Sequence, residues 1–377
     1  MVENKKIMLG DLLEKRIVKK SIAENELVSF IPMEAVTENG VVKENKIIEY
    51  KYVKKGLTYF EKSDVLVAKI TPCFENGKGA CLDNLLTVKG FGSTEFHVLR
   101  ANRDSISRYV FYYTQLNTFR KRLEREMVGS AGQKRIQLKL IENYELKVKH
   151  NKEEQKAIAT ALSDMDNLIL SLEKLISKKK LIKEGAMEEL LTGKKRLDEF
   201  NDNWSEKPLG DIVNIRKGQM ITEELAVKGT IPVIAGGKKP AYYHNKANRF
   251  GNTITVSASG ANAGYISYYV EPIYASDCST IEEGNGYSIQ FIYQQLKLRQ
   301  SEIYKMQTGG AQPHIHPSDL EPIIFTIPNT CEEQEAIATV LSDMDNEIEK
   351  LEKKLDKYKN IKSGMMEELL TGKRRLV

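Results

Sequence analysis

Apolar residues recur at alternating steps of three and four positions in two stretches of the chain. This spacing lines one narrow stripe of an α-helix and is typical of helices that pack against other helices. Charged residues fill most of the other positions. The predicted helix–helix seam consists of Leu162, Met165, Ile169, Leu172 and Ile176 in the first stretch, and of Leu341, Met344, Ile348, Leu351 and Leu355 in the second.

The two stretches are near-identical copies. Residues 151–197 and 330–376 align without a gap at a constant offset (332 − 153 = 179). A helix of about 40 residues spans roughly 60 Å and is not stable alone, so we predict that the copies pack against each other. A generic dimerising coiled coil needs only the apolar pattern, whereas here the letters repeat, as in DMDN and MEELLTG. The copies therefore indicate a duplicated protein whose helices form a shared docking scaffold.

Both copies carry signals for the start and the end of a helix. Asn151 stands three residues before Glu154, and Thr330 three before Glu333, which is the spacing of a capping box. Each copy ends Leu-Leu-Thr-Gly followed by Lys and Arg, the pattern of a C-cap. The sequence therefore predicts two helices of similar length with equivalent ends.

Two variable blocks precede the helices and share one layout. Each begins near a Leu-Gly-Asp motif, continues in short strand-like runs separated by glycine turns, and ends in one helical stretch, a glycine-rich loop and a short strand. The strand-like runs are Leu27–Ile31, Val65–Ile70, Phe96–Leu99 and Tyr144–Val148 in the first block, and Ile231–Ile234, Thr253–Val256, Tyr265–Tyr269 and Ile323–Ile327 in the second; the helical stretches are Tyr109–Met127 and the segment around Phe291–Leu296.

This order predicts the fold class and the division of the chain. We expect mixed α/β (α+β) recognition domains in a pseudo-twofold arrangement, separated by two long antiparallel helices that form a coiled coil. The expected segments are a first recognition domain at 1–150, a first helical region at 151–197, a second recognition domain at 198–329 and a second helical region at 330–377.

Composition narrows the class of protein. A chain of 377 residues with 41% hydrophobic residues is long enough for two or three globular domains. No run approaches the roughly 20 apolar residues of a membrane span, and the N-terminus has no secretion signal. The four cysteines form no CxxC pair and no zinc spacing, so we expect no metal and a reducing cytoplasm. The net charge of +5 is compatible with a polyanionic partner without indicating one.

Short motifs at fixed places resemble a known family, the specificity subunits of type I restriction-modification systems. The chain has Leu-Gly-Asp at the start of each block, Glu-Glu-Gln at each helix start and Leu-Leu-Thr-Gly-Lys at each helix end. Six further segments look like motifs of the family's recognition domains: Glu75–Lys78, Ser93–Phe96, Gly132–Arg135, Pro232–Ile234, Ser259–Gly264 and Ser276–Asp277. The resemblance covers essentially the whole chain; one departure is that the first block lacks a tryptophan like Trp204 ahead of its Leu-Gly-Asp.

The resemblance implies a function in DNA recognition. Each block would read one half of a split, asymmetric double-stranded DNA target. The helices would hold the blocks apart and dock two methyltransferase subunits, which in turn would bind the restriction (motor-nuclease) subunits. The assembled complex would methylate adenine at N6 with S-adenosylmethionine. That cofactor, ATP and magnesium would belong to the partner subunits, and this chain would hold no cofactor.

The residues themselves indicate no catalytic site. No Pro-Pro occurs, so the Asn/Asp-Pro-Pro-Tyr/Phe clamp of adenine methyltransferases is absent, and the two isolated Gly-x-Gly pairs are better interpreted as turns. Asp164 and Asp166, with their copies Asp343 and Asp345, lie on a regular helical pattern beside the seam. We interpret them as a solvated or partner-facing surface rather than as metal ligands.

Candidate DNA contacts are polar and basic residues in glycine-rich loops, because phosphates attract Lys and Arg, and base edges pair with Arg, Asn or Gln. For each one a solvated loop residue is the alternative. Gln133 and Gln312 are separated by 179 positions (312 − 133 = 179), the same offset as the two helical copies, so a structural hydrogen bond common to both blocks is equally possible. Tyr242–Tyr243 and Tyr268–Tyr269 fit base stacking less well than half-buried sheet positions. The candidates are Asn76, Lys78, Gln133, Lys134 and Arg135 in the first block, and Lys217, Gln219, Lys238, Lys239, Asn262, Gln312 and His314 in the second.

A second hypothesis comes from a different class of protein: a coiled-coil scaffold that joins two protein-binding domains. It accounts for the helices and the two blocks without any DNA. Salt dependence separates the two hypotheses, because DNA affinity falls steeply as salt rises. A truncated variant that acts as an inhibitor is a third and weaker alternative.

Overall fold

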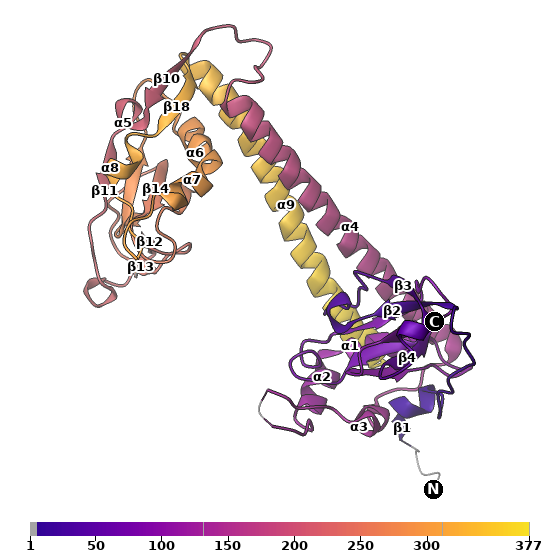
Figure 1. Cartoon of the computed structure of the whole chain (residues 1–377). Coiled ribbons are helices and arrows are strands. Elements are labelled where there is room, and N and C mark those ends of the chain that lie inside the picture. Colours follow the sequence, from indigo (N-terminus) through magenta and orange to yellow (C-terminus); the bar gives the residue numbers. More distant parts are fainter. Residues whose placement is uncertain (1–5, 131, 311, 377) are drawn as a thin grey trace. The chain divides into compact units, whose positions relative to one another are not determined.

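Figure 1 presents the computed structural model, which describes residues 6–130, 132–310 and 312–376. By their internal contacts the residues form two units. The first unit contains Met1–Leu172 and Lys354–Val377, and the second contains Glu173–Lys353. Each unit therefore combines one block with the first half of one long helix and the second half of the other.

Two small sheets form the body of the first unit. One sheet has the strand order β6-β5-β8 and is antiparallel throughout; the other has the order β3-β2-β7-β4, with β2 and β7 parallel. A short ladder joins β1 to β9. The elements are β1 (Ile7–Met8), β2 (Leu27–Ile31), β3 (Lys46–Glu49), β4 (Thr58–Glu61), β5 (Val65–Ala68), β6 (Gly79–Cys81), β7 (Lys89–Gly92), β8 (Phe96–Leu99), β9 (Glu145–Leu146), α1 (Ser107–Gln115), α2 (Asn117–Glu124) and α3 (Leu138–Glu142).

The second unit repeats most of this topology with different residues; it differs in that β11 extends the antiparallel sheet and that β16 is an edge strand, whereas β7 pairs with both β2 and β4. Its sheet β11-β17-β14-β15 contains the same antiparallel trio, with β14, β15 and β17 in the places of β5, β6 and β8. In the sheet β13-β12-β16, β12 and β16 are parallel, as are β2 and β7. The elements are β10 (Trp204–Pro208), β11 (Ile215–Lys217), β12 (Ile231–Ile234), β13 (Tyr242–His244), β14 (Thr253–Ser257), β15 (Ile266–Tyr269), β16 (Tyr274–Ala275), β17 (Cys278–Glu282), β18 (Ile324–Pro328), α5 (Leu209–Ile212), α6 (Ile289–Leu298), α7 (Gln300–Lys305) and α8 (Pro317–Leu320).

The predicted strand-like runs are strands, and their ends match or differ by one or two residues. The prediction of a single late helix in each block was wrong. The stretch Tyr109–Met127 is divided into α1 and α2 by Leu116, whose backbone is extended (φ −60°, ψ 132°). Leu116 is nevertheless buried in the core of the unit. An apolar pattern that continues through a tight turn cannot be distinguished from one continuous helix by periodicity alone. The second block divides similarly, into α6 and α7.

The two predicted long helices are α4 (Lys152–Leu191) and α9 (Cys331–Leu370), each of 40 residues. The capping box before α4 is confirmed. Asn151 N–H donates to Glu154 Oε2 over 3.0 Å, and Glu154 N–H donates to Asn151 Oδ1 over 2.9 Å. The predicted C-cap glycines, Gly193 and Gly372, have φ values of +72° and +73°, the left-handed conformation that a C-cap requires.

The capping box predicted before α9 was wrong. The Thr330 hydroxyl is buried and has no hydrogen-bond partner among the described residues. The Glu333 carboxylate accepts instead from Arg196 Nε (2.6 Å) and Nη2 (2.8 Å) and from Trp204 Nε1 (3.2 Å). In the first unit Glu154 keeps one oxygen for the Asn151 N–H and gives the other to Arg375, whereas both oxygens of Glu333 accept from Arg196. Trp204, which has no counterpart in the first block, donates to one of these two oxygens.

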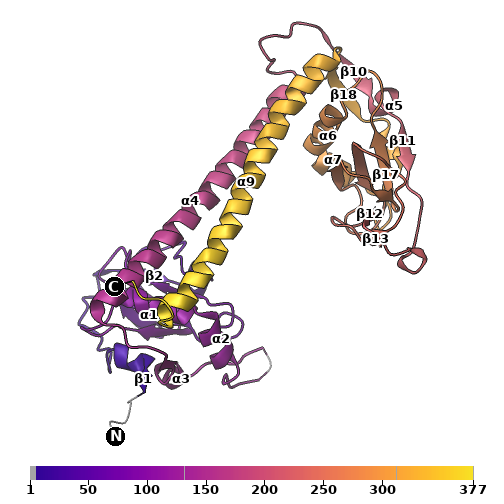
Figure 2. The same ribbon diagram turned by 180° about the vertical axis from the view of Figure 1, so that it is seen from behind.

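Within each unit the halves of α4 and α9 run antiparallel and side by side (Figures 1 and 2). In the first unit Asp166 accepts from Lys362 (2.5 Å). In the second unit the equivalent pair, Asp345 with Lys183, lies at 2.6 Å (345 − 166 = 362 − 183 = 179). Glu154 with Arg375 and Glu333 with Arg196 form a second equivalent set. The antiparallel helices that the fold class predicted are therefore present.

The ten predicted seam residues are all buried or half-buried, and the ends of the helices complete the core of each unit. Ile158 and Leu162 of α4 and Leu369 of α9 join the core of the first unit. Leu191, Ile337 and Leu341 join that of the second. The fully buried seam residues are Leu162, Leu172, Ile176, Leu341 and Ile348, and the half-buried ones are Met165, Ile169, Met344, Leu351 and Leu355.

Candidate nucleic-acid interface

In each unit a loop between two antiparallel strands adjoins a glycine-rich hairpin. In the first unit the β5–β6 loop meets the hairpin of residues 128–135, where Ile70 bridges Arg135 and Thr71 N–H donates to Lys134 O (3.0 Å). In the second unit the β14–β15 loop meets the hairpin of residues 308–314, where Ser259 bridges His314. Most candidate DNA contacts lie on these loops, so the fold brings together residues that are far apart in the sequence. Ala131 and Ala311 lie outside the described residues.

All five of the first block's candidates have side chains that are at least partly accessible. Asn76 is exposed and donates from Nδ2 to Glu38 Oε1 (2.9 Å), and Lys78 is half-buried. Gln133 and Lys134 are exposed on the adjoining hairpin. This grouping of two lysines with two amides can serve both phosphates and base edges.

The remaining candidate of the first block, Arg135, already has a partner. Its guanidinium donates to both carboxylate oxygens of Glu95, with Nε to Oε2 and Nη2 to Oε1 each at 3.0 Å. This pairing lowers the pKa of the Glu95 carboxyl group. A bidentate contact from Arg135 to a base would therefore first have to replace Glu95.

Arg120 is a basic residue beside this loop that the sequence analysis missed. Gly77 has φ +76°, and a Cβ there would lie 1.6 Å from Arg120 Nη1, so only glycine permits this approach. Arg120 Nη2 donates to Gln115 O (3.2 Å), and burial lowers the pKa of its guanidinium. The sequence did contain a signal for Arg120. Arg299 lies 179 positions later (299 − 120 = 179), which is the offset that relates the two long helices, so the arginine is repeated in the second block.

In the second block Asn262, Gln312 and His314 are held close together. Gly260 N–H donates to Pro313 O (2.9 Å), which joins the loop that carries Asn262 to the hairpin. Gln312 is exposed, and Asn262 and His314 are half-buried. These side chains thus form a polar group comparable to that of the first unit.

The second block's lysine candidates lie on neighbouring segments. Lys238 Nζ lies 5.3 Å from the centre of the Tyr265 ring, at the end of the same β14–β15 loop. Lys217 and Gln219 are exposed on either side of Gly218, whose N–H donates to Cys278 O (2.8 Å). Lys239 is exposed as well.

The alternatives for the repeated glutamines and the tyrosine pairs can be compared with the structure. Gln133 and Gln312 are exposed, and in the described parts of the chain neither side chain makes a hydrogen bond. A structural hydrogen bond common to both blocks is therefore not found. Tyr242, Tyr268 and Tyr269 are half-buried sheet residues, whereas Tyr243 is 56% exposed.

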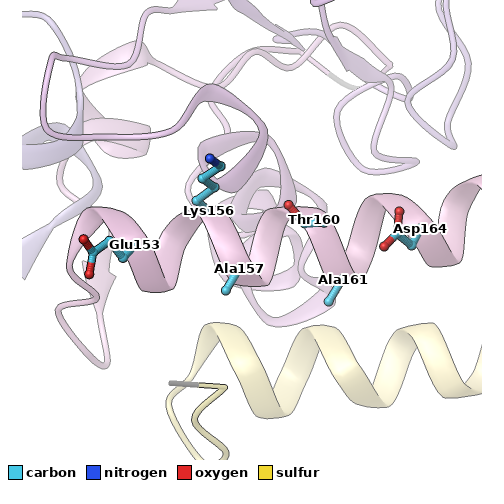
Figure 3. Close-up of a pocket in the computed structure, with 6 residues that line it drawn as sticks. All are labelled: Glu153, Lys156, Ala157, Thr160, Ala161 and Asp164. Carbon is cyan, nitrogen blue, oxygen red and sulfur yellow. The ribbon is translucent and has the colours of Figure 1, made fainter.

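A second repeated surface lies on the long helices. Figure 3 shows a shallow depression along α4 in the first unit. The corresponding positions of α9 in the second unit carry the same residue types except at two places, where Glu335 replaces Lys156 and Val340 replaces Ala161. The face consists of Glu153, Lys156, Ala157, Thr160, Ala161 and Asp164 in α4, and of Glu332, Glu335, Ala336, Thr339, Val340 and Asp343 in α9.

The acidic residues beside the seam do not group as metal ligands. Asp166 accepts from Lys362 and from the Tyr112 hydroxyl (2.6 Å), whereas Asp164 is exposed. Across residues 6–130, 132–310 and 312–376 there is no group of three or more His, Cys, Asp or Glu side chains that could hold a metal ion. In the same residues no helix is long and apolar enough to cross a membrane.

The fold and the paired polar loops define a duplicated protein with two mixed α/β recognition modules and two long helices. The model of the type I restriction modification DNA specificity domain matches residues 1–183 and 201–357. The chain therefore belongs to this family, whose named relatives are specificity subunits, a non-catalytic class.

Curated relatives agree with this assignment. The chain is similar to the EcoAI specificity subunit of Escherichia coli, with 34% identity over 191 residues, which cover 48% of this chain and 32% of the relative. It is also similar to the MjaVIII specificity subunit of Methanocaldococcus jannaschii, with 26% identity over 75% of this chain and 74% of the relative. The chain thus spans about a third of the length of the first curated relatives that it matches, at 32% and 31%.

Solved structures share the fold. A type I restriction-modification S subunit from M. genitalium superposes with a TM-score of 0.68 over 98% of this chain and 97% of its own, at 17% identity. A chain from a structure of the type I R-M system gives 0.59 over 98% and 97%, at 14% identity. At these identities the likeness shows the fold class that the sequence predicted.

Proposed function

We propose that this chain is the DNA-recognition subunit of a type I restriction-modification complex and that it reads a bipartite, asymmetric target. Residues 1–150 and 198–329 are the recognition domains, and 151–197 and 330–377 are the helical regions. The observation that carries the proposal is the pair of units with closely similar topologies but different polar side chains in equivalent loops. Two modules of the same build and different chemistry suit two different half-sites.

The helices support docking of two methyltransferase subunits. The faces that begin at Glu153 and Glu332 repeat at the fixed offset, so two copies of one partner can bind in the same way. The restriction subunits then join through the methyltransferases. S-adenosylmethionine, ATP and magnesium belong to those partners, and the complex works in the cytoplasm on double-stranded DNA.

Methylation mapping tests the proposal directly. The full chain is combined with its cognate methyltransferase, and methylated adenines are located in DNA by single-molecule sequencing. One split motif with two unlike halves is expected. Methylation at no discrete split motif contradicts the proposal.

An insertion tests the role of the helices. About one helical turn is added to the seam of α4, and a matched insertion is made in α9. This change should lengthen the unread spacer between the two half-sites. Half-sites on one face of DNA lie about 34 Å apart for each turn of the duplex. Both half-sequences should stay the same. A changed half-sequence with a constant spacer contradicts the proposed role.

Salt dependence separates this function from that of a protein-binding scaffold. For a DNA-binding protein, the logarithm of the binding constant falls linearly with the logarithm of the salt concentration, with a slope near −0.9 for each phosphate contacted. A scaffold that binds only proteins gives no such slope with duplex DNA.

A further inference from the structure

Tyr265 of the second unit is the structural equivalent of Lys78 in the first. Val67 pairs with Gly79 in the first unit, and Val256 pairs with Ile266 in the second. Tyr265, the residue before Ile266, therefore takes the place of Lys78, the residue before Gly79. The first unit has a basic side chain at this point of the loop, whereas the second has an aromatic ring.

Two ammonium groups lie near that ring. Lys238 Nζ is 5.3 Å from the ring centre and comes from the segment between β12 and β13. Lys297 Nζ is 5.5 Å from it and comes from α6, which packs on β14 and β15 and reaches α9 through Gln294 and Asp345 (Figure 1). Three separate segments thus place two cations and an aromatic ring together, and the second unit recovers the positive charge that Lys78 gives to the first.

The two ammonium groups have no ion-pair partner in the described parts of the chain, where no carboxylate lies within ion-pair distance of Lys238 or Lys297. The nearby Asp345 carboxylate accepts from Lys183 Nζ with both oxygens at 2.6 Å. Burial lowers the pKa of Lys297, the ammonium groups of Lys183 and Lys238 lower it further, and Asp345 opposes them in part. A half-buried cation with like charges around it is relieved when an anion binds.

We infer that Lys238, Lys297 and Tyr265 form a phosphate-binding cluster that grips the DNA backbone beside the base-reading loop of the second unit. This inference rests on the proposed function and adds Lys297 and Tyr265 to the candidate contacts. Lysine ammonium groups suit a phosphodiester as point charges, and the ring fixes both of them without competing for the anion. The cluster contacts the backbone, so it sets affinity and not sequence preference.

The test uses Lys297→Met and Lys238→Met in the full chain with its methyltransferase. Lys305→Met on α7 is the matched control, because Lys305 is exposed and its ammonium group is not placed over the Tyr265 ring. Duplex binding is measured against salt concentration. Each cluster variant should reduce the salt slope by about 0.9 and weaken binding about eightfold at 0.1 M salt, with the methylated motif unchanged. The Lys305 variant should match the wild type.

Thermal unfolding separates a binding role from a structural one. Lys297→Met removes an uncompensated charge from a half-buried site, so the melting temperature should stay equal or rise while DNA affinity falls. Tyr265→Phe keeps the ring and should bind like the wild type, whereas Tyr265→Leu should lose affinity. A fall in melting temperature that accounts for the whole loss of binding overturns the inference.

The remaining outcomes are distinguishable. Normal salt slopes in both lysine variants, with a wild type that methylates a split motif, overturn the cluster and leave the proposed function intact. A wild type that recognises no motif overturns the proposed function itself. Inorganic phosphate, added at constant ionic strength, identifies the source of the ligand. If it raises the melting temperature of the wild type but not of Lys297→Met, the cluster is a site for free phosphate. If the chain binds an acidic protein in place of duplex DNA, the DNA backbone is excluded as the ligand.

Discussion

The first and second units have closely similar topologies but pair their charges differently around equivalent loops. In the first unit Lys78 stands on the loop, and Arg135 of the hairpin is held by Glu95. In the second, Tyr265 takes the place of Lys78, and His314 stands at the helical offset from Arg135 (314 − 135 = 179). The helices differ less, since two of their ion pairs recur at equivalent positions: Asp166–Lys362 with Asp345–Lys183, and Glu154–Arg375 with Glu333–Arg196. Duplication therefore kept these contacts between the helix halves, while the polar loops diverged.

The largest expected effect tests whether the two cores are equivalent. Leu162→Ala and Leu341→Ala each empty a fully buried seam position at the same offset. Each should lower the free energy of unfolding by about 2–5 kcal/mol, because the lost transfer energy and the cavity add. Urea unfolding measures both. Leu168→Ala, at a helix position that is 39% exposed, is the control and should change little. Markedly unequal costs for the matched pair would show that the cores differ.

The second prediction concerns the glutamates of the two capping motifs. Glu333→Gln breaks a fork with Arg196 and a bond from Trp204, at a carboxylate that is fully buried. It should cost about 1.5–3 kcal/mol, which is typical of a hydrogen bond to a charged group. Glu154→Gln should cost less, since glutamine preserves the box and Arg375 is 53% exposed. Trp204 is the only tryptophan of the chain, so its fluorescence reports the second unit. An equal loss in both variants contradicts the prediction.

The third prediction separates the two helix starts. Asn151→Ala removes a side chain that caps α4 and should cost about 1 kcal/mol. Thr330→Ala removes a buried hydroxyl that has no hydrogen-bond partner in the described part of the chain, so stability should stay the same or increase slightly. Thermal unfolding of both variants checks this. A comparable loss at Thr330 would mean that its hydroxyl caps α9 after all.

The smallest effect is a pH dependence in the first unit. The Asn151 N–H and the Arg375 guanidinium lower the pKa of Glu154 below 4.5. Its contribution is complete above the unfolded pKa near 4.5 and is lost as pH falls through the lower folded pKa. Unfolding of wild type and Glu154→Gln from about pH 6 to about pH 3 should therefore converge as the pH falls. A difference that stays constant over this range contradicts the assignment.

The sequence by itself determined the duplication, the two long helices and the general layout of each block. These features depend on local periodicity and on repeated letters, such as the seam from Leu162 to Ile176 and the glycines that end each helix. It also gave the strands of each block within a few residues, because β-branched runs between glycine turns carry their own signal.

Only the tertiary structure decided which charges are paired and which remain free. The Glu333 carboxylate accepts from Arg196 and Trp204 instead of forming a capping box. Arg135 pairs with Glu95, and the ammonium groups of Lys238 and Lys297 both lie near the Tyr265 ring. The partners in these contacts lie between 27 and 137 positions apart (265 − 238 = 27 and 333 − 196 = 137), and no local pattern links them. Side-chain electrostatics depend on distance in space, and that distance is known only once the strands and the antiparallel helix halves of each unit are in place.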